Sequence, residues 1–317
     1  RENYLGWISP VRGPVNPVNI NLESRNGLGF LDGFDEWICR CGLSSIGAPG
    51  TDIISDHMGI PAEVLLPLHG KIANTSAHLV KVDSLPDQQK LQITGHIQES
   101  SMFGPSVHLS CLISTQPGSN RITLEDTITN ISGRPAEIQI LYHCNYGKPF
   151  LTEGARMLVP FSRMAPRDTE AAKSVNEAST YRKPTPEFAE QVFYYQPLGD
   201  DKKRSLSALI TPGGDKAAVL RFDVNQLPCF TQWKNTAAVE DGYVTAMEPG
   251  TSFPNTKTME RSANRIVNLQ PKQEYKIRLD LEVYDNPESV KQITEEIDEI
   301  QRRNSRQVLT SPYPEFH

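Results

Sequence analysis

The sequence lacks any long apolar run and any basic run long enough to bind a phosphate backbone. Its apolar stretches are interrupted by Pro, Gly or His within about ten positions, whereas a membrane-spanning helix needs roughly 20 apolar residues. The 32 Lys and Arg residues are outnumbered by 38 Asp and Glu residues, which gives a net charge of -6. The sequence therefore argues against a membrane span, and it carries no basic surface suited to nucleic acid.

Cysteine is also scarce, and the common cofactor motifs are missing. The five cysteines are an odd number and are widely spread, unlike a secreted disulfide framework, so we expect a reducing, cytoplasmic compartment. Cys39 and Cys41 have no matching second pair, and no two histidines have ligand spacing on one helix, so we expect no metal. No nucleophile-elbow, Walker or dinucleotide motif is present, which removes phosphoryl and hydride transfer and predicts no cofactor.

What the sequence does contain is alternation of apolar and polar residues, the pattern of strands with one buried face. Turn-forming clusters rich in Gly, Pro, Asn and Ser separate these runs, and no linker or internal repeat divides the chain. We therefore predict one all-β domain over residues 1–317, a large and mainly antiparallel β-sandwich. The clearest runs are residues 107–113, 122–128, 138–142, 218–224 and 275–283.

One helix is expected near the C-terminus, at about residues 287–303. Asn286, Pro287 and Glu288 supply an N-cap, a proline at the first helical position and an acidic first turn. An apolar stripe at helical spacing follows, so this helix should pack across a sheet edge as part of the core. The stripe consists of Val290, Ile293, Ile297 and Ile300.

Polar side chains gather first in the segment Leu68-His-Gly-Lys-Ile-Ala-Asn74. Glycine beside His69 allows a ligand to approach the backbone, and imidazole, ammonium and amide groups can hydrogen-bond hydroxyls. His69, Lys71, Asn74 and the nearby His78 are therefore candidate ligand-binding residues. The alternative is a polar turn that leads into the next strand.

A second cluster, Leu141-Tyr-His-Cys-Asn-Tyr-Gly147, ends an alternating run. Continued alternation would place His143 and Asn145 on one face of the strand, and Tyr142, Cys144 and Tyr146 on the other. A histidine and an asparagine then point the same way and could fix a ligand. The alternative is a structural histidine at a strand end.

A third cluster contains Glu248, which follows an apolar run and directly precedes Pro249. Proline favours extended geometry at Glu248, so the carboxylate would project at a sheet edge or into a cleft, where it could act as a base. Upstream, Trp233 stands among polar residues and could stack on a sugar ring. The alternatives are a solvated surface glutamate and a core tryptophan.

Taken in order, the three clusters resemble the galactose mutarotase-like superfamily, and more narrowly an aldose 1-epimerase-related branch described mainly as a domain of unknown function. The similarity runs from about Gly27 to about Val283. It implies the superfamily's β-sandwich fold and an isomerase that interconverts sugar anomers. His143 corresponds to the general acid, Glu248 to the general base, and the His69-Gly70 element to a sugar-binding segment.

The sequence departs from the family pattern near the first cluster. Typical mutarotases have an arginine soon after the His-Gly element, but this chain has none between Arg40 and Arg121. Either Lys71 replaces it in reading a phosphate, or the sugar carries no phosphate. A lyase or hydrolase acting on a modified sugar and a non-catalytic sugar-binding module remain alternatives.

Overall fold

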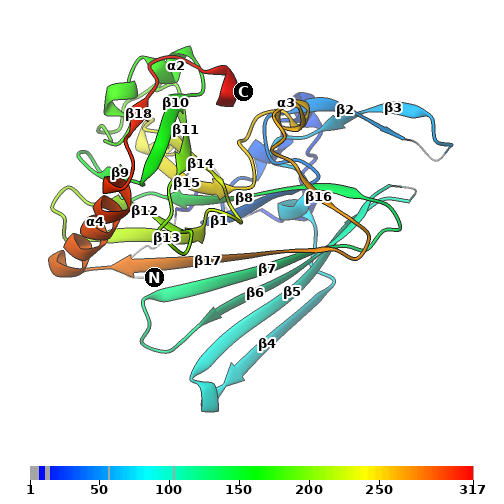
Figure 1. Cartoon of the computed structure of the whole chain (residues 1–317), viewed down its shortest axis with the longest axis horizontal. Helices are drawn as coiled ribbons and strands as arrows, with labels where there is room; N and C mark the ends of the chain where they lie inside the picture. The colour runs from blue at the N-terminus through cyan, green and yellow to red at the C-terminus, as the bar shows by residue number, and fades with distance from the viewer. Residues whose placement is uncertain (1–6, 11–14, 56–57, 103, 317) are drawn as a thin grey trace.

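The protein is described by a computed structural model over residues 7–10, 15–55, 58–102 and 104–316. Its two large sheets stack to form a β-sandwich, with short helices and a projecting hairpin at the periphery (Figure 1). Almost all neighbouring strands are antiparallel, and the pair β10–β18 is parallel. The all-β sandwich predicted from the alternation is therefore confirmed.

The first sheet carries the two strands that matter most for function, β8 and β15, as direct neighbours. The short strand β16 pairs with β8 beyond this row. In spatial order the sheet contains β1 (Ile38–Leu43), β8 (Ala136–Tyr146), β15 (Val244–Gly250), β14 (Cys229–Asn235), β11 (Gln191–Pro197), β10 (Phe161–Pro166) and β18 (Gln307–Val308), with β16 at Val267–Leu269.

The second sheet closes the other side of the core, and a separate hairpin stands apart from both sheets. The hairpin consists of β2 (Gly50–Ser55) and β3 (Pro61–Leu66). In spatial order the second sheet contains β4 (Leu79–Leu85), β5 (Lys90–Ser100), β6 (Ser106–Thr115), β7 (Arg121–Asn130), β17 (Glu274–Tyr284), β13 (Ala217–Asp223), β12 (Arg204–Ile210) and β9 (Arg156–Leu158).

The main core lies between the two sheets and is built by the alternating runs. On β6, Leu109 is fully buried while His108 and Ser110 are only partly buried, as a period of two requires. Strand β8 is buried on both faces: Tyr142 and Cys144 enter the main core, whereas Leu141 belongs to a second cluster on the outside of the first sheet. The next layer must therefore cover that outer face.

This covering layer is the N-terminal part of the chain. Phe30, Ile46 and Leu141 share a buried cluster on the outer face of the first sheet, with Phe34 and Leu68 packed against it. The segment includes α1 (Ser24–Gly27) and short turns of 3-10 helix at Gly29–Asp32 and Ile72–Asn74. Where this N-terminal layer and the first sheet are not in contact, a pocket can form between them.

The C-terminal helix forms as predicted, but it covers a sheet face instead of an edge. Helix α4 spans Pro287–Arg302, and the Asn286 side chain caps it by accepting a hydrogen bond from the Ser289 amide (2.9 Å). Its apolar stripe packs on the outer face of β12 and β13, because residues such as Leu206 and Val219 point away from the main core there. The other helices of the described chain are short: α2 (Thr169–Ala172) and α3 (Lys257–Ser262).

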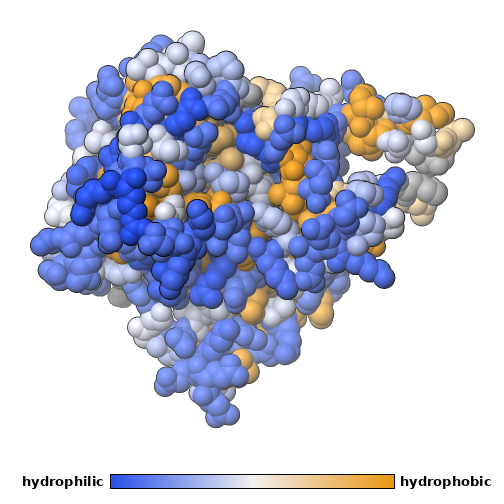
Figure 2. Space-filling view, viewed as in Figure 1, coloured by the Kyte–Doolittle hydropathy of each residue, from blue (hydrophilic) through white to orange (hydrophobic). Residues whose placement is uncertain are grey.

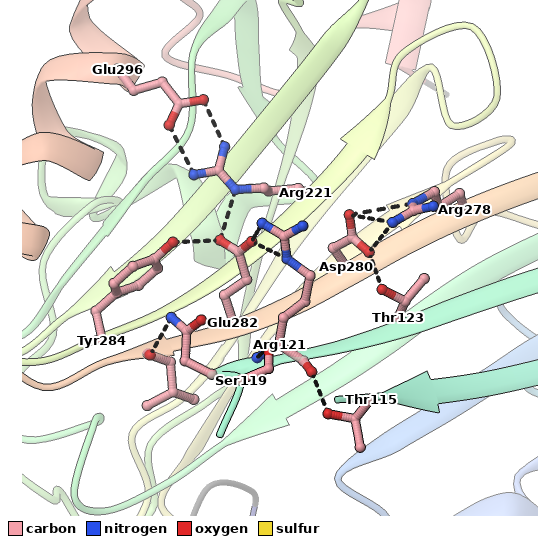
Figure 3. A network of polar contacts seen from close by, with 12 residues as sticks. Thr115, Ser119, Arg121, Thr123, Arg221, Arg278, Asp280, Glu282, Tyr284 and Glu296 are labelled. Atoms are coloured by element: carbon pink, nitrogen blue, oxygen red, sulfur yellow. Dashed lines mark hydrogen bonds and ion pairs between the residues drawn. The ribbon is translucent and has the colours of Figure 1, made fainter. Parts of the chain in front are cut away.

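A charged network fastens this outer face (Figure 3). The buried Glu282 of β17 accepts hydrogen bonds from Arg121 Nε (2.6 Å), Arg221 Nε (2.7 Å) and the Tyr284 hydroxyl (2.8 Å). Arg221 also pairs in bidentate fashion with Glu296 of α4, at 2.6 and 2.9 Å. One carboxylate thus links β7, β13 and β17, and through Arg221 it reaches α4.

The surface and the thiols complete the description. The β2–β3 hairpin exposes Ile53, Met58 and Ile60, and Figure 2 shows this region as an apolar projection. All five cysteines are free and buried, four in the first sheet and Cys111 in β6 of the second. None of the helices within the described ranges is long and apolar enough to cross a membrane.

Candidate active site

His143 and Glu248 face each other across two neighbouring strands of the first sheet. β8 and β15 pair antiparallel, with Met247 opposite Cys144 and Gly250 opposite Leu141. This register places Glu248 directly opposite His143. Both side chains are buried, and His143 Nε2 lies 3.2 Å from Glu248 Oε1. The strand register thus joins two residues that local sequence leaves unconnected.

The hydrogen bonds around His143 define its tautomer. Asn145 Nδ2 donates to the Glu36 carbonyl (2.8 Å), so Asn145 Oδ1 faces His143 Nδ1 at 2.8 Å. An amide oxygen only accepts, so Nδ1 carries a proton and the Nε2 lone pair of a neutral ring points to Glu248. His143 and Asn145 share one strand face, as the alternation predicted.

Burial pushes the pKa values of the two groups toward their neutral forms. Burial, together with His69, lowers the pKa of His143 well below its ordinary value, and the Asn145 hydrogen bond opposes this only in part. Burial also raises the pKa of Glu248 well above its ordinary value, with repulsion from Glu190 adding to it. Both shifts favour the neutral forms, a carboxylic acid beside a neutral imidazole, in which the pair holds one proton. This charge state is the reverse of the one implied by a histidine acid and a glutamate base.

His69 stands next to His143, with ring centroids 5.3 Å apart. Its Nδ1 lies 2.8 Å from the Ile46 carbonyl and must donate to it, so Nε2 of the neutral ring is an acceptor. Gly70 supports this turn with a φ of +75°, and a Cβ there would lie 2.2 Å from the Gly42 carbonyl oxygen. The close approach explains why glycine follows the histidine.

Trp233 forms an aromatic side of the same site. The indole Nε1 donates to Glu190 Oε2 (2.7 Å), and Glu190 Oε1 accepts from Arg167 Nη2 (3.0 Å). The Trp233 ring lies edge-on to His143 at 5.4 Å and to Phe34 at 6.0 Å. Glu190 and Arg167 therefore hold the ring in place at the side of the pocket.

These residues line a pocket of about 460 Å³ between the first sheet and the N-terminal layer. The sheet contributes His143, Glu248, Thr231 and Trp233, while Phe34 comes from the covering layer. Thr231 Oγ1 and Glu248 Oε1 are buried and make no hydrogen bond within the described part of the chain. Two polar atoms on paired strands thus lack a hydrogen-bond partner among the described residues, at the wall of a pocket whose volume is typical of small-molecule sites.

Not every residue singled out from the sequence reaches this pocket. Lys71 lines a different cavity, of about 570 Å³, beside the β2–β3 hairpin. The Asn74 side chain donates to the Pro17 carbonyl (2.7 Å), which secures the covering layer. His78 lies beside His96 and His108 on the second sheet, with ring centroids 6.3 and 6.1 Å away. The structure brings together His69, His143, Glu248 and Trp233, with Asn145 behind His143.

Arg167, Glu190 and Thr231 are among the pocket residues that the sequence analysis did not single out. Thr231 was within reach, because it stands two positions before Trp233 on β14 and so shares its face. Arg167 follows β10 and Glu190 precedes β11. Their meeting depends on the pairing of β10 with β11, which no local pattern reveals.

The chain matches one known protein family. A family model described as a domain of unknown function, DUF4432, matches residues 1–283. The chain belongs to the DUF4432 family. No curated protein matches this DUF4432 member.

Two solved structures are similar to this chain in fold. A Klebsiella pneumoniae protein described as a candidate aldose 1-epimerase is 38% identical, with a TM-score of 0.90 over 97% of this chain and 78% of that one. A galactose mutarotase-like protein from Clostridium acetobutylicum is 14% identical, with a TM-score of 0.53 over 78% of this chain and 79% of that one. The DUF4432 chain thus has the galactose mutarotase-like fold, as the resemblance implied.

Proposed function

We propose that this DUF4432 protein interconverts the anomers of a sugar, with His143 and Glu248 as its acid/base pair. The observation that carries the proposal is the buried contact of 3.2 Å between His143 Nε2 and Glu248 Oε1 at the wall of the pocket. The kinship with candidate aldose 1-epimerases supports it.

The chemistry needs two groups of opposite protonation close together. Ring opening removes the proton from the anomeric hydroxyl, forms the C1 carbonyl and breaks the bond from C1 to the ring oxygen, which takes up a proton. Both oxygens are bonded to C1, so the acid and the base must be neighbours. A pair that holds one proton meets this requirement without a net change.

The roles of the pair alternate within one turnover. In the resting state Glu248 donates to the ring oxygen and His143 Nε2 accepts from the anomeric hydroxyl. Rotation about the bond from C1 to C2 then presents the other face of the aldehyde. Closure returns both protons in the reverse direction, so each residue serves once as acid and once as base. His69 Nε2 accepts a hydrogen bond from a substrate hydroxyl and fixes its orientation.

The decisive experiment measures anomer exchange by NMR on a panel of free sugars, with His143→Asn and Glu248→Gln variants. Each single change should lower the rate by about 100- to 10,000-fold, because it removes one positioned proton transfer. The double variant should lose far less than the product of the two, since the residues act as a unit. Glu240→Gln, an exposed carboxylate, is the control.

The pH profile gives a second readout. The wild-type rate should fall at low pH, where protonation of His143 leaves the pair with two protons. It should also fall at high pH, where Glu248 ionises and the pair has none. New products in the NMR spectrum would instead reveal cleavage, and shifted ligand signals without exchange would reveal a binding module. Fully multiplicative losses would contradict the pair.

A further inference from the structure

The ionised groups around the pocket are mostly acidic. Glu190 and Asp241 line it together with the neutral Glu248, and Arg167 is its one guanidinium among the described lining residues. Arg167 already pairs with Glu190 (3.0 Å) and with Asp168 (2.9 Å), so its charge is matched by two carboxylates. An anionic group on a ligand would meet repulsion that Arg167 does not offset.

The wall that faces the sheet is apolar. Residues 28–34 and 48–49 contribute Leu28, Phe30, Leu31, Phe34 and Pro49 to the pocket lining. The Phe34 ring lies 5.1 Å from the His143 ring, so this wall reaches the proposed reaction centre. A hydroxyl pressed against these side chains would lose its water without gaining a partner, whereas a methyl or methylene group would gain contact.

The opposite side of the pocket suits hydroxyls. Thr231 Oγ1 is buried, unpartnered within the described residues and directly opposite Glu248 in the strand register. Asn235 follows on the same face of β14. A ligand that satisfies both sides has hydroxyls along one edge and an apolar group along the other.

We propose that the pocket selects an uncharged deoxy sugar, with hydrogen in place of a hydroxyl on the edge that meets residues 28–34, and that it rejects sugar phosphates and uronic acids. The proposal rests on the anomer interconversion proposed above. It also assigns no phosphate-reading role to Lys71, which lies at a different cavity.

The test compares kcat/KM for anomer exchange on matched sugars: galactose and glucose, their 2-deoxy and 6-deoxy counterparts, their 6-phosphates and their uronic acids. At least one deoxy sugar should exceed its parent by about 10- to 100-fold, the range that a hydrophobic pocket achieves for one group. The anionic sugars should fall at least about 10-fold below the parent.

Two variants probe the two halves of the argument. Leu31→Asn places an amide on the apolar wall and should reduce the preference for the deoxy sugar by about 10-fold. Leu91→Asn on β5 is the matched control, because Leu91 has similar exposure (48% against 50%) and is not among the lining residues of the pocket. Glu190→Gln keeps an acceptor for the Trp233 indole but removes a charge, so it should raise activity on the uronic acids relative to the parent sugar.

The outcomes separate the two proposals. Exchange that is as fast on parent hexoses as on deoxy sugars, or faster on anionic ones, would overturn the substrate class while leaving anomer interconversion standing. A panel on which no sugar exchanges faster than in buffer would overturn both.

Discussion

The contact between His143 and Glu248 carries a cost for the folded protein as well as a chemical role. A carboxyl with a raised pKa contributes stability that is fully present below its ordinary value and is lost as pH rises through the folded value. His143, with a lowered pKa, contributes stability that is lost as pH falls through its folded value. The folded protein therefore loses stability when the pH rises through the pKa of Glu248 and also when it falls through the pKa of His143.

We expect Glu248→Gln to be more stable than wild type by roughly 0.5–2 kcal/mol near neutral pH, the usual gain when a functional group that destabilises the fold is removed. The gain should grow as pH rises above 4.5, because glutamine does not titrate. Urea denaturation at several pH values measures it, and Glu240→Gln should show no such trend. A constant difference across pH would show that Glu248 is not held neutral by the fold.

At this scale the sequence predicted the residues that share a strand face and missed those that meet through pairing. His143 and Asn145 alternate on β8, and their common face follows from a period of two. The contact with Glu248 depends on a register between strands more than 90 residues apart in the chain, and the family resemblance supplied it. Lys71 is close to His69 in sequence, but the left-handed turn at His69 and Gly70 changes the chain direction between them.

Strands and one helix were predictable as elements because their patterns are local. The apolar stripe and Asn286 cap define α4 almost to the residue. Its docking on a face was not predictable, since it depends on the outward residues of β12 and β13, for which no local pattern indicates a partner. The charged network around Glu282 was equally hidden, because its members come from four elements.

We expect Glu282→Gln to lower the free energy of unfolding by about 1.5–3 kcal/mol, since it weakens charge-assisted hydrogen bonds from two arginines to a buried carboxylate. Glu274→Gln on the same strand is the control, because Glu274 forms an exposed pair with Lys276 and should matter by less than about 0.5 kcal/mol. Chemical denaturation compares them. Equal effects would mean that the network does not fasten the outer face.

For the molecule as a whole, the two sheets share one core. Leu109 and Leu279 of the second sheet belong to the same buried cluster as Tyr142 and Phe230 of the first. Neither sheet can retain its packing when the other is lost, so separation into independent halves would expose most of that cluster. The single domain expected from the sequence stays a prediction, and this shared core is the reason to expect it.

Calorimetry should therefore record one heat-absorption peak, with the calorimetric enthalpy equal to the van't Hoff enthalpy. Two resolved peaks, or a van't Hoff value well below the calorimetric one, would mean that the sheets unfold separately. A ligand-free sample is sufficient for this measurement.

The distribution of the five buried thiols turns the chain into its own reporter of breathing motions. A water-soluble disulfide reagent can modify a shielded sulfur only during moments when its surroundings open. Four sulfurs report on the sheet that holds the pocket, and Cys111 reports on the other sheet. Mass-resolved labelling at each position would thus reveal whether the pocket sheet loosens alone, without adding a probe.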